Sequence, residues 1–261
     1  PVTSVDVPGA RLRLEYSDEG GHPVVQLHGL TSSLERDRVL DLDLGRGLSG
    51  TRLLRYDARG HGRSTGRPVA DDYRWPRLAQ DLLALLDVWF PGERVHGVGP
   101  SMGCATLLHA ALLDPGRFSG LTLMVPPTAW ETRAAKAHDY ERSAEAVEAH
   151  GLELLLRAQA AAPAPPATAG APDTVPDVRT DLLPWVFRGA ARSDLPDRKA
   201  LRSIDLPTTI LAWTDDPAHP LSTAETLLDL LPRATLQVAS TRAEVHLWPA
   251  VLMADVEHTG R

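Results

Sequence analysis

A serine stands at the tightest point of an apolar stretch, where its hydroxyl group would be available for chemistry. The run GVGPSMGCAT at 97–106 contains Ser101 between Gly99 and Gly103 and fits the pattern G-x-S-x-G. The serine joins a predicted strand to a predicted helix, and the flanking glycines allow a sharp turn there. We interpret Ser101 as a nucleophile exposed beside the first N–H groups of the helix. A plain Gly-Ser turn is the alternative.

Strand-like and helix-like segments alternate on both sides of this serine. Apolar runs bounded by turn residues predict strands at 11–16, 23–28, 51–57, 94–100, 119–125, 206–213 and 234–240. Helical spacing of apolar residues predicts helices at 75–92, 102–116 and 222–231 and from about Trp248. This alternation predicts an α/β fold, with a mostly parallel central sheet that helices flank on both faces.

The alternation stops between about 128 and 205. The segment 130–160 is rich in Ala and Glu and predicts helix, and helix resumes at 178–190. Between them, the Pro- and Ala-rich segment 161–177 predicts an irregular connection and a mobile edge of the entrance. We therefore expect a core formed by 1–127 and 206–261. A helical cap inserted at 128–205 is expected to cover the active site and contribute to specificity.

Four motifs in order make the chain similar to the α/β-hydrolase superfamily: VVQLHG, RYDARGHGRS, GPSMG and LAWTDDPAHP. The chain looks closest to small, cofactor-free bacterial serine hydrolases such as carboxylesterases and 3-oxoadipate enol-lactonases. Pro100 departs from the His or Gln that more commonly precedes the nucleophile, which changes the packing around the turn but not the hydroxyl. The resemblance implies an α/β-hydrolase fold with an inserted helical cap.

The resemblance also implies a catalytic triad in the chain order serine, acid, histidine. Asp216 matches the family's Asp-Pro-x-x-Pro loop and is expected to be the acid, with Asp215 as a solvated neighbour. His246 follows the last predicted strand, where the family places its base, and is expected to be that base. The match is irregular, because Val245 stands where the family usually has Gly and the histidine comes about two residues late.

Two further histidines follow the expected acid. His219 is so near Asp216 in sequence that an approach to Ser101 from the opposite side looks difficult, so we expect a loop residue that lines the site. His258 lies in the last turn of the closing helix and remains an alternative base. A purely structural role for His246 is also an alternative.

Acyl transfer further needs N–H groups that stabilise an oxyanion. The Met102 N–H follows the nucleophile, and the family position implies the Leu30 N–H as the second donor. Further candidates for the substrate pocket lie beside these residues, near the acid or in the expected cap: His28, Gly29, Thr31, Trp130, Trp185 and His219. A structural role for His28, and packing between cap and core for the two tryptophans, are the alternatives.

Composition narrows the class of protein. The 261 residues are 43% hydrophobic and 23% charged, as in ordinary globular proteins, and the net charge of −7 without a basic run argues against nucleic-acid binding. No apolar run is long enough to span a membrane, and residues 1–10 lack the regions of a signal peptide, so we expect a cytoplasmic protein.

The single cysteine, Cys104, is expected in the core. Neither metal-ligand spacing nor a G-x-G-x-x-G motif is present, so no metal and no cofactor are expected.

These features together predict a serine hydrolase that cleaves a small to medium, largely apolar ester, lactone or thioester through an acyl-enzyme. A serine rather than an aspartate at the nucleophile position argues against epoxide hydrolase or haloalkane dehalogenase chemistry. The alternatives are a lyase, C–C bond hydrolysis, an acyl transfer or cyclisation on the same fold, or a non-catalytic small-molecule binder. The expected partner is a small-molecule substrate, and a homodimer is compatible with the sequence.

Overall fold

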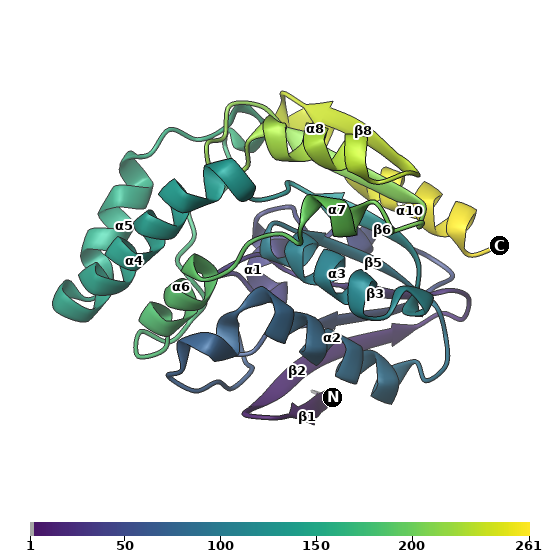
Figure 1. Cartoon of the computed structure of the whole chain (residues 1–261), viewed down its shortest axis with the longest axis horizontal. Helices are drawn as coiled ribbons and strands as arrows, with labels where there is room; N and C mark the ends of the chain where they lie inside the picture. The colour runs from purple at the N-terminus through teal and green to yellow at the C-terminus, as the bar shows by residue number, and fades with distance from the viewer. Residues whose placement is uncertain (1–2) are drawn as a thin grey trace.

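The computed structural model describes residues 3–261 and contains one eight-stranded sheet (Figure 1). Pro1 and Val2, the first residues of the segment considered for a signal peptide, lie outside this range. The strands are β1 (Thr3–Val7), β2 (Ala10–Asp18), β3 (Pro23–Gln26), β4 (Arg52–Tyr56), β5 (Val95–Pro100), β6 (Phe118–Met124), β7 (Thr208–Trp213) and β8 (Ala234–Ala239). Their order is β1-β2-β4-β3-β5-β6-β7-β8. Strand β2 is antiparallel to both neighbours, and β3 to β8 are parallel.

The sheet separates two apolar cores, because successive side chains of a strand point to opposite faces. Val25 and Leu54 belong to one core, whereas their neighbours Val24 and Leu53 belong to the other. Every residue of the central strands β5, β6 and β7 is buried. This burial explains why these strands read as continuous apolar runs in the sequence.

Helices cover both faces of the sheet. In the described residues they are α1 (Leu34–Val39), α2 (Trp75–Trp89), α3 (Met102–Leu113), α4 (Arg133–His150), α5 (Leu152–Ala161), α6 (Leu183–Ala191), α7 (Arg198–Leu201), α8 (Leu221–Leu230), α9 (Arg242–Val245) and α10 (Trp248–Thr259). Apolar residues of α2, α3 and α8 fill one core, and those of α10 fill the other. The expected α/β fold with a mostly parallel sheet is therefore confirmed.

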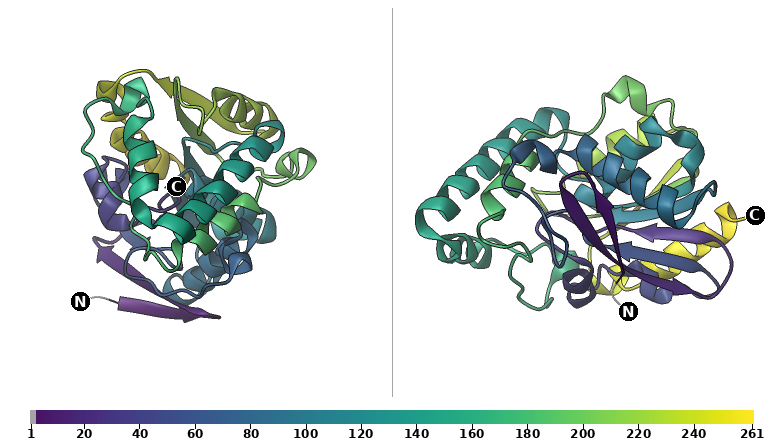
Figure 2. Two further views of the ribbon diagram at one scale, coloured as in Figure 1. Left: turned by 90° about the vertical axis from the view of Figure 1, so that its left-hand side faces the viewer. Right: turned by 90° about the horizontal axis from the view of Figure 1, so that it is seen from below.

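Helices α4, α5, α6 and α7 lie between β6 and β7, without a strand among them. Helices α4, α5 and α6 stand away from the sheet in Figure 1 and in the right-hand view of Figure 2. Ala144 and Val147 of α4 pack with Leu183 and Val186 of α6 in a third apolar cluster, which Tyr73 joins from outside this part of the chain. The Pro-rich segment 161–177 contains only one short helical turn, Pro166–Thr168, because proline interrupts regular hydrogen bonding.

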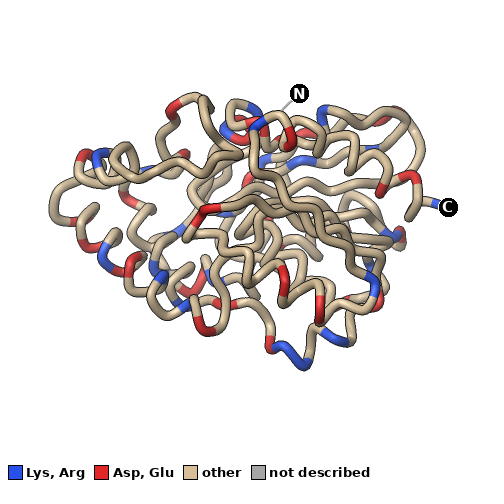
Figure 3. The backbone as a smooth tube through the Cα atoms, turned by 90° about the horizontal axis from the view of Figure 1, so that it is seen from above, with Lys and Arg blue, Asp and Glu red and all other residues tan. Residues whose placement is uncertain are grey.

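Two boundaries differ from the sequence-based expectation. The predicted strand at 11–16 is the central part of β2, which pairs with the unpredicted strand β1 across the turn at Pro8 and Gly9. Helix α6 begins at Leu183 rather than near 178, with a proline in its first turn. Among residues 3–261, no helix is both long and apolar enough to cross a membrane. Acidic and basic positions are intermixed along the chain (Figure 3).

Candidate active site

Ser101 occupies the sharp turn between β5 and α3. Its backbone angles are φ 49° and ψ −107°, a conformation that a residue with a side chain rarely adopts. Two backbone hydrogen bonds hold it there: Ser101 N donates to Met124 O at 3.0 Å, and Ala105 N donates to Ser101 O at 3.0 Å. The strained turn therefore directs the hydroxyl group away from the strand and leaves it beside the first turn of α3.

The two glycines of the motif are needed because other chain segments approach them closely. A Cβ atom at Gly99 would lie 2.9 Å from Leu27 Cβ, and one at Gly103 would lie 3.0 Å from His28 O. Both distances are below ordinary van der Waals contact. The G-x-S-x-G spacing therefore reflects the packing of this turn against the segment that follows β3.

The imidazole that contacts Ser101 belongs to His219. His219 Nε2 lies 3.0 Å from Ser101 Oγ, and His219 Nδ1 lies 2.7 Å from Asp216 Oδ2. An ionised carboxylate only accepts hydrogen bonds, so Nδ1 carries the proton and Nε2 is free to accept from the serine hydroxyl. The three side chains form a continuous hydrogen-bonded chain from Asp216 through His219 to Ser101.

A tight turn brings His219 and Asp216 together. His219 N donates to Asp216 O at 3.0 Å across Pro217 and Ala218, so Asp216 is the first residue and His219 the fourth residue of a β-turn. Asp at the first position and Pro at the second are both favourable in such turns. The turn folds the imidazole back onto the carboxylate, and this explains why closeness in sequence does not keep His219 away from Ser101.

Asp216 has two further donors that fix its orientation. Trp213 Nε1 donates to Oδ2 at 2.7 Å, and Ala218 N donates to Oδ1 at 3.0 Å. Burial alone would raise the pKa of Asp216, but the hydrogen bond and charge of His219, with the Trp213 and Ala218 donors, outweigh it and lower the pKa to about 2. The carboxylate is therefore ionised at neutral pH. Asp215 is exposed, as expected of a solvated neighbour.

The expectation that His246 contacts Ser101 is wrong. His246 lies just after α9, where its side chain is 47% exposed and Nε2 is 3.3 Å from Asp41 Oδ2. Asp41 also pairs with Arg46 and Arg242, so His246 belongs to a peripheral ion-pair group. The short helix α9 follows β8 in place of the loop that would carry a base toward the serine. The alternative base, His258, is exposed near the end of α10.

Two backbone N–H groups beside Ser101 are free to bind a ligand oxygen. Met102 is the first residue of α3, and Leu30 follows Gly29, at which a Cβ would lie 3.8 Å from Ser101 Cβ. Within residues 3–261, no protein acceptor is assigned to either N–H. The Met102 N–H also lies at a helix N-terminus, where the helix dipole favours negative charge.

Ser101 and His219 open into a cavity of about 740 Å³ between the carboxyl ends of the strands and helices α4 to α6. Gly29 and Thr31 also line it, as expected, and Leu30 lies between them in the lining. Further lining residues come from parts of the chain that are distant in sequence: Arg36, Lys136, Tyr140, Phe187, Trp213 and the segment 171–175. The volume suits a small to medium organic molecule.

Three residues expected to line the pocket do not do so. His28 is buried and bridges Ala58 N and Gly29 O, and burial lowers its pKa to about 4, so it is a neutral structural residue. Trp130 donates to Pro196 O and packs against Arg198. Trp185 lies on α6 beside Arg188. All three side chains are held in packing contacts outside the cavity lining.

Sequence reasoning missed several side chains of the site. Trp213 stands at the end of β7 and three residues before Asp216. This position could have identified it from the sequence as a neighbour of the expected acid. Tyr140 and Phe187 stack at 5.9 Å across α4 and α6, a contact that depends on tertiary packing. Arg36 and Lys136 give the walls more charge than expected.

Asp37 is a buried carboxyl group in the wall of the cavity. Its Oδ1 accepts a hydrogen bond from Ser32 Oγ at 2.6 Å, whereas Oδ2 has no partner within residues 3–261. Burial raises the pKa of Asp37 from the usual 3.8 to about 7, against smaller opposing effects of Ser32 and Arg36. In the folded protein this group therefore holds its proton up to nearly neutral pH.

The raised pKa of Asp37 predicts a loss of stability as the pH rises. Between about pH 4 and pH 7 the unfolded chain has released this proton while the folded protein retains it, so the unfolding free energy declines by up to roughly 4 kcal/mol. The Asp37→Asn variant cannot ionise and is expected to lack this decline. Urea unfolding of both proteins at about pH 5 and about pH 8 measures the part of this decline above pH 5, roughly 3 kcal/mol. An identical pH dependence in the two proteins would contradict the assignment.

Comparison with known proteins places this chain in a family. Residues 22–249 match the family described as alpha/beta hydrolase fold. The 3-oxoadipate enol-lactonase 1 of Acinetobacter baylyi is 30% identical over 193 residues, which are 67% of this chain and 65% of that protein. Esterase YbfF of Escherichia coli is 28% identical over 124 residues, 47% of this chain and 46% of that protein.

Structural comparison agrees with the sequence match. The crystal structure of a hydrolase from Pseudomonas aeruginosa PA01 superposes with a TM-score of 0.78 at 23% identity, covering 99% of this chain and 97% of that one. The chain belongs to the α/β hydrolase fold family. It spans 65% and 46% of the lengths of the two curated relatives described above.

Proposed function

We propose that the protein is a serine hydrolase that cleaves a carboxylic ester, lactone or thioester of small to medium size. The observation that carries the proposal is the hydrogen-bonded chain from Asp216 through His219 to Ser101, which opens into a cavity of about 740 Å³. The names of the relatives, an enol-lactonase and an esterase, support ester and lactone substrates.

In the first half of the reaction, Ser101 Oγ attacks the carbonyl carbon and His219 Nε2 accepts the hydroxyl proton. Asp216 holds the imidazole by Nδ1 and stabilises the imidazolium that forms. When the tetrahedral intermediate collapses, the bond to the alcohol or thiol breaks and His219 returns the proton to the leaving group. Ser101 then carries the acyl group as an ester.

In the second half, water attacks the acyl-enzyme while His219 Nε2 accepts a proton from it. Collapse of this second intermediate releases the carboxylic acid and returns the proton to Ser101. The N–H groups of Met102 and Leu30 are the proposed donors to the oxyanion in both halves, because both lie beside Ser101 and have no acceptor among residues 3–261. One such donor typically contributes about 10²–10³ in rate.

The segment 128–205 is proposed to act as a cap that selects substrates. Lys136, Leu156 and Phe187 of this segment line the cavity opposite the strand ends. The cap therefore supplies walls that contact the parts of a substrate that do not react, whereas the strand ends supply the reacting groups. These two roles agree with the packing of α4 and α6 in an apolar cluster that is distinct from the two cores beside the sheet.

A panel of substrates tests the proposal. The protein is expected to hydrolyse 4-nitrophenyl esters of short to medium acids and small lactones, with a burst of one 4-nitrophenol per active site if deacylation is slower than acylation. Ser101→Ala is expected to abolish this activity. Ser203→Ala is its matched control, because Ser203 is an exposed serine in a turn after α7. Failure of the wild-type protein to cleave any ester, thioester or lactone would contradict the proposal.

A further inference from the structure

We propose that the cavity selects esters or lactones that carry a carboxylate group apart from the scissile bond, and that Arg36 binds this carboxylate. The proposal rests on the proposed function, because it concerns the same cavity. Arg36 lies on α1 and lines the cavity together with Ser101 and His219.

The side chain of Arg36 is fixed in position by neutral groups. Nε donates to Thr174 Oγ1 at 3.0 Å, and Nη1 donates to Thr31 O at 3.2 Å and to Thr31 Oγ1 at 3.3 Å. These three hydrogen bonds leave the positive charge in place while they restrict the motion of the guanidinium. A cation held in this way binds an anion at a lower entropic cost than a mobile side chain.

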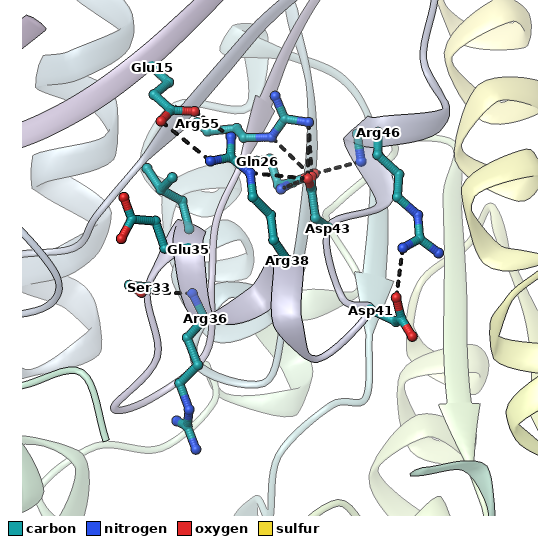
Figure 4. A network of polar contacts seen from close by, with 12 residues as sticks. Glu15, Gln26, Ser33, Glu35, Arg36, Arg38, Asp41, Asp43, Arg46 and Arg55 are labelled. Atoms are coloured by element: carbon teal, nitrogen blue, oxygen red, sulfur yellow. Dashed lines mark hydrogen bonds and ion pairs between the residues drawn. The ribbon is translucent and has the colours of Figure 1, made fainter. Parts of the chain in front are cut away.

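Arg36 has no carboxylate partner in the described part of the chain. No Asp or Glu oxygen among residues 3–261 lies within ion-pair distance of it. Burial lowers the pKa of Arg36 and outweighs the opposing charges of Asp37 and Asp177. Figure 4 shows Arg36 pointing away from the polar network in which Arg38 and Arg55 meet Glu15 and Asp43. Neighbouring arginines are thus neutralised by carboxylates, whereas Arg36 is not.

One nitrogen of Arg36 remains available to a ligand. Within residues 3–261, Nη2 has no protein acceptor, and it is not among the atoms sealed from solvent without a partner. A carboxylate accepts charge-assisted hydrogen bonds from such a group. Arg36 therefore presents a positive charge to the cavity that it lines, and one of its donors is not used by the described residues.

The position of Arg36 limits the distance between the carboxylate and the reacting carbonyl. Nη1 contacts Thr31, the residue directly after Leu30, whose N–H is the proposed oxyanion donor. Two residues of chain and one hydrogen bond separate the two, so the guanidinium lies within roughly 10 Å of that N–H. An acyl chain of about five carbon atoms spans such a distance.

A second cation strengthens the field in the cavity. Lys136 on α4 lines the same cavity, and its Nζ lies 5.2 Å from the centre of the Tyr140 ring. Of the acidic residues that line the cavity, Asp37 keeps its proton up to about neutral pH and Asp173 is exposed. The interior wall therefore favours an anionic group over an uncharged one.

Two esters of equal shape test the inference: mono-4-nitrophenyl glutarate, with a terminal carboxylate, and 4-nitrophenyl 5-methylhexanoate, with an isopropyl group in its place. Wild-type protein is expected to have the higher kcat/KM on the glutarate ester. Arg36→Gln is expected to lower the ratio of kcat/KM on the glutarate ester to kcat/KM on the uncharged ester about 10–100-fold, mainly through KM for the glutarate ester. Arg202→Gln, which removes an exposed arginine charge elsewhere, is the matched control.

The outcomes separate this inference from the proposed function. Cleavage of both esters without preference for the anionic one, or an equal loss on both in Arg36→Gln, overturns the role of Arg36 and leaves the hydrolase proposal standing. If neither ester is cleaved, the result counts against the hydrolase proposal. In that case, calorimetric titration of the wild-type and Arg36→Gln proteins with glutarate still tests the site. Equal affinity in both proteins overturns it, and binding only to the wild-type protein supports it.

Discussion

The Ser101→Ala variant is expected to lose ester hydrolysis by at least about 10⁴-fold in kcat while it retains the fold. The substitution removes the oxygen that forms the acyl-enzyme, so any residual rate comes from water and from the N–H donors beside the substrate. Steady-state kinetics with a cleaved 4-nitrophenyl ester measure the loss. A thermal melt of the variant checks that the strained turn still forms.

The Ser203→Ala control is expected to keep the wild-type rate, because Ser203 donates only to Ala200 O in an exposed turn. The Ser101→Ala substitution does not relieve the backbone strain at position 101, because alanine also has a side chain and would keep the same positive φ. A Ser101→Ala protein that is folded and retains more than about one tenth of the activity would rule out a covalent role for Ser101.

His219→Ala is expected to lower kcat/KM by about 10³–10⁵-fold, whereas His246→Ala changes it less than about 2-fold. His219 is the imidazole in contact with Ser101 Oγ, and His246 instead pairs with Asp41. The two variants form a matched pair, because each removes one imidazole that contacts an aspartate. Kinetics on the same ester distinguish them.

The double variant Ser101→Ala/His219→Ala adds a further check. Residues that act as one unit give non-additive losses, so the double variant is expected to be about as slow as Ser101→Ala alone. A large loss in His246→Ala with little change in His219→Ala would reverse the assignment and return the base to the position after β8.

The parallel sheet and the serine turn could be predicted because their signals are local. β5, β6 and β7 are buried on both faces, so each reads as an apolar run of strand length. Gly99 and Gly103 are required by close approach of Leu27 and His28, and this requirement leaves the G-x-S-x-G spacing in the sequence. Strand β1 was not predicted. It is short, and its alternation of polar and apolar residues indicates a strand only when its pairing with β2 is known.

His219 and His246 both follow Ser101 and Asp216, so the order serine, acid, histidine does not distinguish them. The position after the last strand favours His246, and closeness to Asp216 in sequence counts against His219 only while the turn between them is ignored. The family resemblance implied a base after the last strand, and His246 was the histidine nearest that place. The segment Asp216–His219 nevertheless has the composition of a β-turn, and a β-turn brings its first and fourth residues together. Whether His219 also reached Ser101 depended on where the end of β7 lies relative to β5, which a sequence does not specify.

The cavity wall was the least predictable part of the site. Trp130 and Trp185 lie in the proposed cap and were therefore plausible wall residues, but each pairs with an arginine outside the cavity. Arg36 lines the cavity because Thr31 and Thr174, far apart in sequence, both hold its guanidinium. Such contacts arise from tertiary packing, so no local pattern in the sequence predicts them.

Covalent labelling with a fluorophosphonate, followed by mass spectrometry, tests the central claim most directly, because the reagent reacts with a serine hydroxyl only when a base activates it. We predict one adduct on Ser101 in the wild-type and His246→Ala proteins, and labelling slowed at least about 100-fold in His219→Ala. An unlabelled wild-type protein, or His219→Ala labelled at the wild-type rate, would contradict the account.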